Sequence, residues 1–101
     1  MKRLIVDELP SDPLGASSLF HQNWFDPIER ALMAGTDVTV VLEPADHTHE
    51  EWRRAVVAML ARKHAPRRVN LVAGGGAALD AVEDYLANAP GITGQYLRAA
   101  T

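Results

Sequence analysis

The residues best suited to chemistry in this sequence lie in one short cluster after an apolar, β-branched run at 37–43. A strand is expected to end there, and the cluster then comprises Asp46, His47, His49 and Glu50. Imidazole and carboxylate groups at this spacing could hold a divalent metal ion, or a histidine could act as a general base. A helix start rich in acidic residues is the simpler explanation, because carboxylates are stabilised at the positive end of the helix dipole. We therefore assign no catalytic residue and no metal ligand, and retain His47 and His49 as candidate ligand-binding residues.

A second candidate site is the run of glycines Gly74, Gly75 and Gly76, which follows an apolar segment and precedes a helical pattern. Backbone N–H groups at such a strand-to-helix turn can bind an anion, assisted by the helix dipole. The run lacks both the Gly-x-Gly-x-x-Gly spacing and the lysine of a P-loop. A tight turn that needs positive φ is the simpler explanation, so these glycines are retained only as candidate ligand-binding residues.

The segment 52–64 is predicted to form an amphipathic helix that packs on the sheet. Thr48 with Glu51 fits a capping box before it, and Pro66 ends it. One face carries apolar residues at helical spacing, namely Trp52, Ala55, Val56, Met59 and Leu60. The basic residues in and after the helix are interpreted as a solvated face rather than an anion site: Arg53, Arg54, Arg62, Lys63, Arg67 and Arg68.

Val57 and Ala61 lie on a helical wheel between Arg53 and Arg54, opposite the apolar face. Small apolar residues on an outer face would permit close approach of another subunit, although single exposed apolar residues are common. We therefore expect Val57 and Ala61 to form part of a subunit interface. Trp24 is expected to pack in the core or at that interface, rather than to stack on a ligand.

The remaining elements alternate between strand and helix. Pattern and turn signals predict strands at 4–6, 37–43, 69–73 and 93–99, with a loop at 10–18. A helix at 77–87 follows the third of these strands. Another helix precedes the second strand, with Asp26 as its N-cap, Pro27 at its first position and Gly35 at its end. Such alternation is typical of parallel sheets with right-handed crossovers. The fold class is therefore α/β, a three-layer Rossmann-like domain at 1–101 with about four parallel strands and helices on both faces.

Composition excludes several classes of function. The 101 residues suffice for one small domain, and the net charge of −3 gives no general attraction to nucleic acid. There is no cysteine, which excludes disulfides and cysteine-ligated zinc. No apolar run approaches the roughly 20 residues that span a bilayer, and Asp7 and Glu8 interrupt any signal-peptide pattern. We expect a cytoplasmic protein with neither nucleic acid nor membrane as partner.

Two stretches carry a resemblance to a known family. Residues 67–75 read RRVNLVAGG and residues 91–99 read GITGQYLRA, with a helical segment of matching length between them. These stretches resemble the Arg-Val-Asn strand and the Ile-Thr-Gly-Gln ending of short-chain dehydrogenases/reductases. The resemblance implies a truncated Rossmann-type fold that corresponds to the C-terminal half of the family's domain.

The resemblance also implies what this chain does not share with the family. The glycine-rich cofactor fingerprint belongs to the half that has no counterpart here. The family's Tyr-x-x-x-Lys pair would fall near Asp46 and Glu50, and its catalytic serine near Leu42, Glu43 and Pro44. None of these residues supplies the same chemistry, so the resemblance argues against the activity and no cofactor is expected.

Three functions remain open at this point. The preferred hypothesis is a non-catalytic Rossmann-like domain that acts as a homodimer or with a protein partner. It is supported by a first strand that would lack the neighbour it has in the parent sheet. The alternatives are a small-ligand or nucleotide-binding module that uses Gly74–Gly76, and an enzyme with an unrecognised site at His47 and His49.

Overall fold

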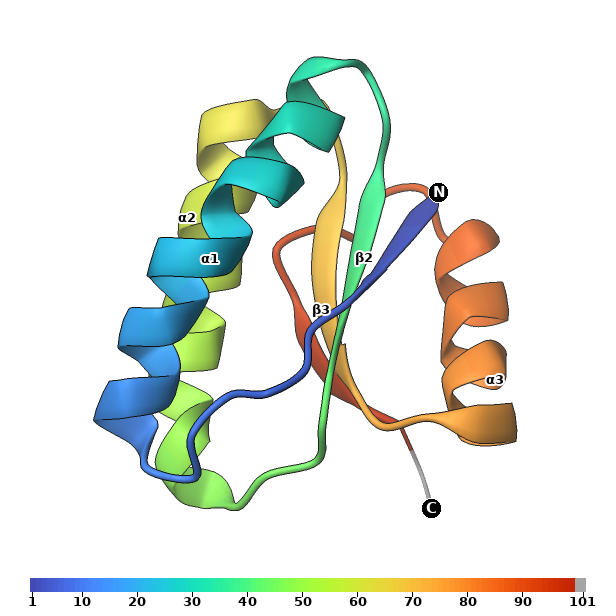
Figure 1. The fold of residues 1–101 in the computed structure, drawn as a ribbon. Helices are drawn as coiled ribbons and strands as arrows, with labels where there is room; N and C mark the ends of the chain where they lie inside the picture. The colour runs from blue at the N-terminus through green and yellow to red at the C-terminus, as the bar shows by residue number, and fades with distance from the viewer. Residues whose placement is uncertain (100–101) are drawn as a thin grey trace.

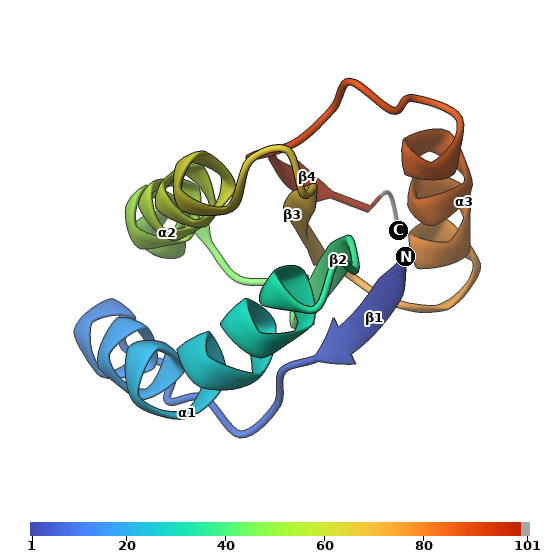
Figure 2. The same ribbon diagram turned by 90° about the horizontal axis from the view of Figure 1, so that it is seen from above.

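The computed structural model describes residues 1–99, which form three layers (Figure 1). A parallel sheet stands in the middle, with α1 and α2 on one face and α3 on the other (Figure 2). The elements in chain order are β1 (Lys2–Ile5), α1 (Pro13–Met33), β2 (Val38–Leu42), the 3-10 helix η1 (His47–His49), α2 (Glu50–His64), β3 (Val69–Ala73), α3 (Gly76–Ala87) and β4 (Tyr96–Arg98). The predicted α/β class is confirmed.

The four strands lie in the spatial order β1-β2-β3-β4, which is also their order in the chain. All three pairings are parallel, with Lys2 beside Val38, Val38 beside Val69, and Leu71 beside Tyr96. Because every strand runs the same way, all carboxyl ends meet at one edge of the sheet, where ligands bind in open parallel sheets.

The two inner strands explain why this arrangement is stable. Every residue of β2 and β3 is buried, as expected of strands that are covered on both faces. One core cluster, centred on Phe20, Ile28 and Leu71, fills the space between the sheet and α1 with α2. A smaller cluster around Val72, Leu79 and Leu86 lies under α3.

The first helix is longer than predicted. It begins at Pro13, where Asp12 is the N-cap and its carboxylate accepts a hydrogen bond from the Gly15 N–H at 2.7 Å. Pro27 lies inside the helix instead of starting it, so the predicted start at Asp26 and the loop at 10–18 are wrong. The buried side chains Phe20 and Ile28, on either side of the predicted boundary, give the helix one continuous apolar stripe.

The start of α2 also differs from the prediction. Asp46 caps η1 through the Thr48 N–H, and α2 then begins at Glu50 with no side-chain cap. The predicted capping box between Thr48 and Glu51 is therefore wrong. The connection from β2 to α2 is therefore short, and its last residue in η1, His49, is buried in the protein interior.

The predicted outer face of α2 is wrong as well. Val57 is fully buried, Ala61 packs on the same core cluster, and Met59 is 46% exposed. The helix is enclosed on two sides, because it contacts α1 as well as β3 and β4. The turn at Gly94 closes over Ala61, since a Cβ on this glycine would lie 3.1 Å from the alanine Cβ. These two residues therefore do not form an exposed apolar patch.

Asn70 shows how the Arg-Val-Asn stretch serves the fold. Its buried side chain accepts a hydrogen bond from the Gln95 N–H at 3.0 Å and donates to the Ile92 carbonyl at 3.2 Å. The strand β4 is thereby held in register, although it is shorter than the predicted 93–99. Within residues 1–99, no helix combines the length and apolar character needed to cross a bilayer.

Candidate functional site

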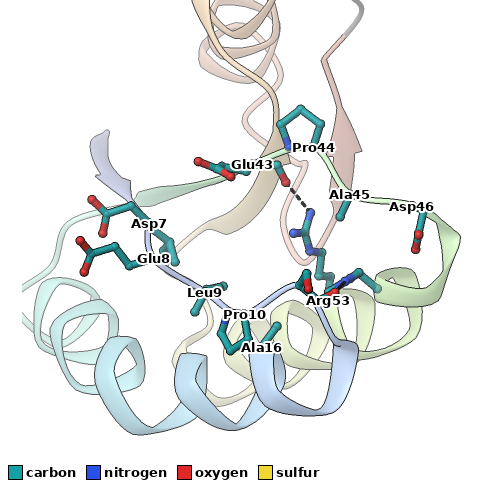
Figure 3. A pocket seen from close by; sticks show the side chains of 13 residues that line it. Asp7, Glu8, Leu9, Pro10, Ala16, Glu43, Pro44, Ala45, Asp46 and Arg53 are labelled. Atoms are coloured by element: carbon teal, nitrogen blue, oxygen red, sulfur yellow. Dashed lines mark hydrogen bonds between the residues drawn. The ribbon is translucent and has the colours of Figure 1, made fainter.

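A cavity of about 300 Å³ opens at the carboxyl ends of β1 and β2 (Figure 3). One wall is the connection from β1 to α1, and the other is the connection from β2 to η1. We call this space the β1–β2 cavity. It is lined by Val6, Asp7, Glu8, Leu9, Pro10, Ser11, Ala16, Glu43, Pro44, Ala45, Asp46, His49 and Arg53.

Each of the two connections has a distinctive local conformation. Glu8 has φ 58°, in the left-handed region that non-glycine residues rarely adopt. On the other side, Pro44 fixes the chain as it leaves β2, and Asp46 caps η1. The hydrogen bonds from the side chain and backbone of Thr48 hold the pKa of the Asp46 carboxyl below its usual range.

Arg53 is the buried charge of the cavity. Only 4% of the residue is exposed, and its Nη1 donates to the Glu43 carbonyl and to the Tyr96 hydroxyl, both at 3.0 Å. The guanidinium carbon lies 5.5 Å from the Trp52 ring centroid and 5.6 Å from that of Tyr96. These aromatic contacts partly compensate the loss of water around the cation.

The compensation of Arg53 is incomplete. Its Nε is buried and has no hydrogen-bond partner. Among residues 1–99, no carboxylate lies within ion-pair distance of its guanidinium, and Nη1 alone donates to a protein acceptor. A buried cation usually has a paired anion, so the interior wall of the cavity carries unbalanced positive charge.

The mouth of the cavity has the opposite charge. Asp7 and Glu8 lie on the β1 side, and Glu43 on the β2 side (Figure 3). All three residues are exposed, and none forms an ion pair with another part of the chain that the structure describes. The site therefore combines a cation at depth with carboxylates at the entrance.

The two histidines singled out from the sequence lie in different surroundings. His49 is buried, and its Nδ1 accepts a hydrogen bond from the Trp52 indole N–H at 3.0 Å. The other ring nitrogen, Nε2, therefore carries the proton and donates to the Ser11 carbonyl at 2.9 Å. His47 is exposed and does not line the β1–β2 cavity.

These contacts leave His49 without a free ring nitrogen for catalysis or metal binding. Both ring nitrogens are occupied within the fold, so the imidazole joins η1 to the start of α1 and has no lone pair to offer a proton or metal. Across the described chain, no group of three His, Asp or Glu side chains could hold a metal ion.

The glycine run has a structural requirement at two of its three positions. Gly74 has φ 139°, donates its N–H to the Leu42 carbonyl at 3.0 Å, and packs so closely that a Cβ would lie 2.7 Å from the Ala99 Cβ. Gly76 has φ 61°. Gly74 and Gly75 also line a shallower hollow of about 360 Å³, which shares Val6, Asp7, Glu43 and Pro44 with the β1–β2 cavity. The turn is thus dictated by the fold and lies next to the candidate site.

Asp46 and Glu50, near which the resemblance puts the family's catalytic pair, both have structural contacts. Asp46 accepts the capping bonds of η1, and the Glu50 carboxylate pairs with Arg98. Trp24 is half-buried and packs against the main core, as does Trp52.

Sequence reasoning missed Arg53, the acidic residues Asp7 and Glu8, and the side chain of Glu43 as parts of one site.

Comparison with protein-family models gave a match over residues 4–99 to the SDR-like family, described as short chain dehydrogenase-like protein. This match confirms the resemblance seen at 67–75 and 91–99, and extends it over almost the whole chain. No match was found among curated proteins or among solved structures.

Proposed function

The chain belongs to the SDR-like family of short chain dehydrogenase-like proteins, and from this premise we propose that it is a non-catalytic domain that binds a small ligand in the β1–β2 cavity. The observation that carries the proposal is Arg53, a buried cation without a paired anion in the wall of a cavity of about 300 Å³. Ligand sites are concave, with a few convergent polar groups, and lie at the carboxyl ends of parallel strands.

The non-catalytic part of the proposal rests on what the site lacks for hydride transfer. The resemblance puts the Tyr-x-x-x-Lys pair near Asp46 and Glu50, and both carboxylates are engaged within the fold. His49 has both nitrogens occupied. We expect neither saturable binding of NADH or NADPH nor oxidation of either with a panel of carbonyl compounds, as followed by absorbance. Turnover that survives further purification would contradict this part alone.

Ligand binding is tested with a cavity-filling variant. Ala45 lies in the wall, and Ala45→Trp should occupy the entrance. Ala77→Trp is the matched control, because Ala77 is exposed on α3, across the sheet. A library of small polar compounds, screened by NMR chemical shifts, should give compounds that bind the wild type and Ala77→Trp but not Ala45→Trp. Binding that is equal in all three proteins, or absent in all three, would overturn the proposal.

A second candidate function is assembly through the edge of the sheet, and Ile5 favours it. This residue is 59% exposed on β1, whose outer side pairs with no strand of residues 1–99. Exposed apolar edges are a liability that proteins usually cover. A homodimer therefore remains our proposal, with its contact moved from Val57 and Ala61 to β1. The cytoplasmic location expected from the sequence also stays a prediction.

Sedimentation at micromolar concentration tests this assembly. We expect the wild type to sediment as a dimer and Ile5→Glu as a folded monomer. Tyr85→Glu, at a similarly exposed position on α3, is the control and should remain dimeric. A wild type that stays monomeric at high concentration would contradict the homodimer.

A further inference from the structure

The ligand chemistry of the β1–β2 cavity can be narrowed from its charges. We propose that the cavity takes a small zwitterion, with a carboxylate that pairs with Arg53 and an ammonium group that faces Glu43 and Asp7. This inference rests on the proposed function, and adds to it the chemical class of the ligand. It joins three features of the site: the unpaired guanidinium, the acidic entrance and the limited volume.

The first step is the missing anion. Arg53 is largely withdrawn from water, and its two side-chain hydrogen bonds go to a carbonyl and a hydroxyl, which carry no full charge. Its Nε donor is unused. A guanidinium presents its donors as a planar fork that matches a carboxylate. A ligand carboxylate would therefore supply the negative charge that no described residue places beside Arg53.

A purely structural role for Arg53 explains less of what is seen. Contacts with the rings of Trp52 and Tyr96 account for the packing of the guanidinium. They do not account for the position of the cation on a cavity wall, or for the unpartnered Nε. An apolar side chain of similar length would pack equally well there without the desolvation cost of a buried charge.

The second step is the acidic entrance. Asp7, Glu8 and Glu43 would repel a simple anion on its way to Arg53. A simple cation would be attracted by these carboxylates but would meet the guanidinium at depth. A molecule with both charges satisfies both regions, and its orientation follows from them: carboxylate inward, ammonium outward.

The third step is size. Pockets for drug-sized ligands occupy about 300–1,000 Å³, so this cavity lies at the lower limit. The apolar part of the lining is small and rigid, with Pro10, Ala16 and Pro44 among its members. A compact aminocarboxylate of amino-acid size fits this description better than a nucleotide does.

The experiment compares zwitterions with their single-charge analogues. The probes are β-alanine, 4-aminobutyrate and a set of L-amino acids, against propionate, butyrate and butylamine, with binding followed by NMR titration. At least one aminocarboxylate should give saturable shifts at cavity residues. Its affinity should exceed that of the matched carboxylate and amine by about tenfold or more.

Paired variants assign the two charges. Arg53→Met should abolish zwitterion binding, whereas Arg54→Met, at the exposed neighbouring position, should leave it unchanged. Glu43→Gln should lower the affinity for the zwitterion several-fold and raise the affinity for the simple carboxylate. Glu51→Gln, on α2 outside the cavity, is its control. Circular dichroism verifies that each variant is folded, and the exposed Glu43 position keeps the test decisive if Arg53→Met does not fold.

The outcomes separate this inference from the proposed function. If every aminocarboxylate that binds is equalled by its matched carboxylate or amine, or if no aminocarboxylate binds at millimolar concentration, the zwitterion inference is overturned. In either case the proposed function survives when an uncharged or singly charged compound binds in a way that Ala45→Trp prevents. If no compound of any class binds, both fail.

Discussion

Arg68 and Arg53 are both drawn into the fold, at opposite ends of the same parallel sheet. Arg68 immediately precedes β3, and its guanidinium donates to three carbonyls, with Nε to Ile92 at 3.0 Å and Nη2 to Leu86 at 2.8 Å and Ala89 at 3.1 Å. Its backbone N–H donates to the Asp37 carboxylate at 2.8 Å. Arg53 has one engaged nitrogen and a cavity beside it.

The difference shows what each arginine does. The acceptors of Arg68 lie at and after the end of α3, where the carbonyls at a helix end carry partial negative charge and can accept a second hydrogen bond. Arg68 therefore fastens the connection from α3 to β4 onto the sheet. Around Arg53 the fold supplies fewer acceptors than the side chain has donors. Each arginine lacks a carboxylate partner for its guanidinium among the described residues, but the fold supplies three acceptors to Arg68 and leaves the Nε of Arg53 without one.

The largest expected effect comes from moving the buried charge by one helical turn. Val57 lies four residues after Arg53 on the buried side of α2, but does not line the β1–β2 cavity. Val57→Arg should destabilise the domain by more than about 5 kcal/mol, enough to unfold a protein of this size. Ala55→Arg, at an exposed position of the same helix, should change little. Circular dichroism and urea titration measure both, and a folded Val57→Arg would show that the cavity is not what permits Arg53.

Loss of Arg68 should have the next largest effect. Arg68→Met removes three hydrogen bonds from a charged donor, at a cost of about 3 kcal/mol, although each of the three carbonyls keeps one other donor. The thermal midpoint should fall by more than about 10 °C, given about 4–8 °C per kcal/mol for domains of this length. The exposed Arg62→Met is the control. A thermal midpoint equal to that of the wild type would mean that Arg68 does not stabilise the fold, and would contradict the structural role that we assign to it in contrast to Arg53.

Arg53→Met should cost less than Arg68→Met, about 1 kcal/mol or below. The variant loses two hydrogen bonds, but it also loses the desolvation penalty of an unpaired buried cation. Methionine can occupy the space between the rings of Trp52 and Tyr96. Chemical denaturation of the two variants side by side measures the difference. An equal loss in both would mean that Arg53 serves the fold as Arg68 does.

The sequence predicted most of the fold because its inner strands are unambiguous. Strands such as β2 and β3, buried on both faces, produce continuous apolar runs, and strand–helix alternation then leaves few topologies. The boundary of α1 was misplaced because Asp12-Pro13 and Asp26-Pro27 are equally good start signals. Only the tertiary contacts of Phe20 and Ile28 decide between them.

The site was harder to predict, for a different physical reason. Arg53 occupies the same stripe of α2 as Val56 and Val57, which was a usable signal, but charged residues are ordinarily placed outside. Its acceptors, the carbonyl of Glu43 and the hydroxyl of Tyr96, come from two other parts of the chain. Helical periodicity also cannot reveal that α2 is enclosed by α1 and by the sheet together, which widened its buried face.

The smallest expected effect is a dependence on pH at the amino end of the sheet, where Glu29 of α1 meets the end of α2. Its carboxylate accepts hydrogen bonds from Lys63 Nζ and from His64 Nε2, both at 2.6 Å, and these contacts hold the pKa of Glu29 below the ordinary 4.5. Because the pKa is lower in the folded state than in the unfolded chain, the contribution to stability is complete above about pH 4.5 and disappears as the pH falls through the folded value.

Glu29→Gln should therefore be less stable than the wild type at pH 7, by about 1 kcal/mol or less, since the Lys63 side chain is largely exposed. Urea titrations of both proteins from pH 7 to about pH 3 should show the difference shrinking below about pH 4.5. A gap that persists in acid would mean that Glu29 stabilises the fold through packing, and that paired charge is not what distinguishes this end of the sheet.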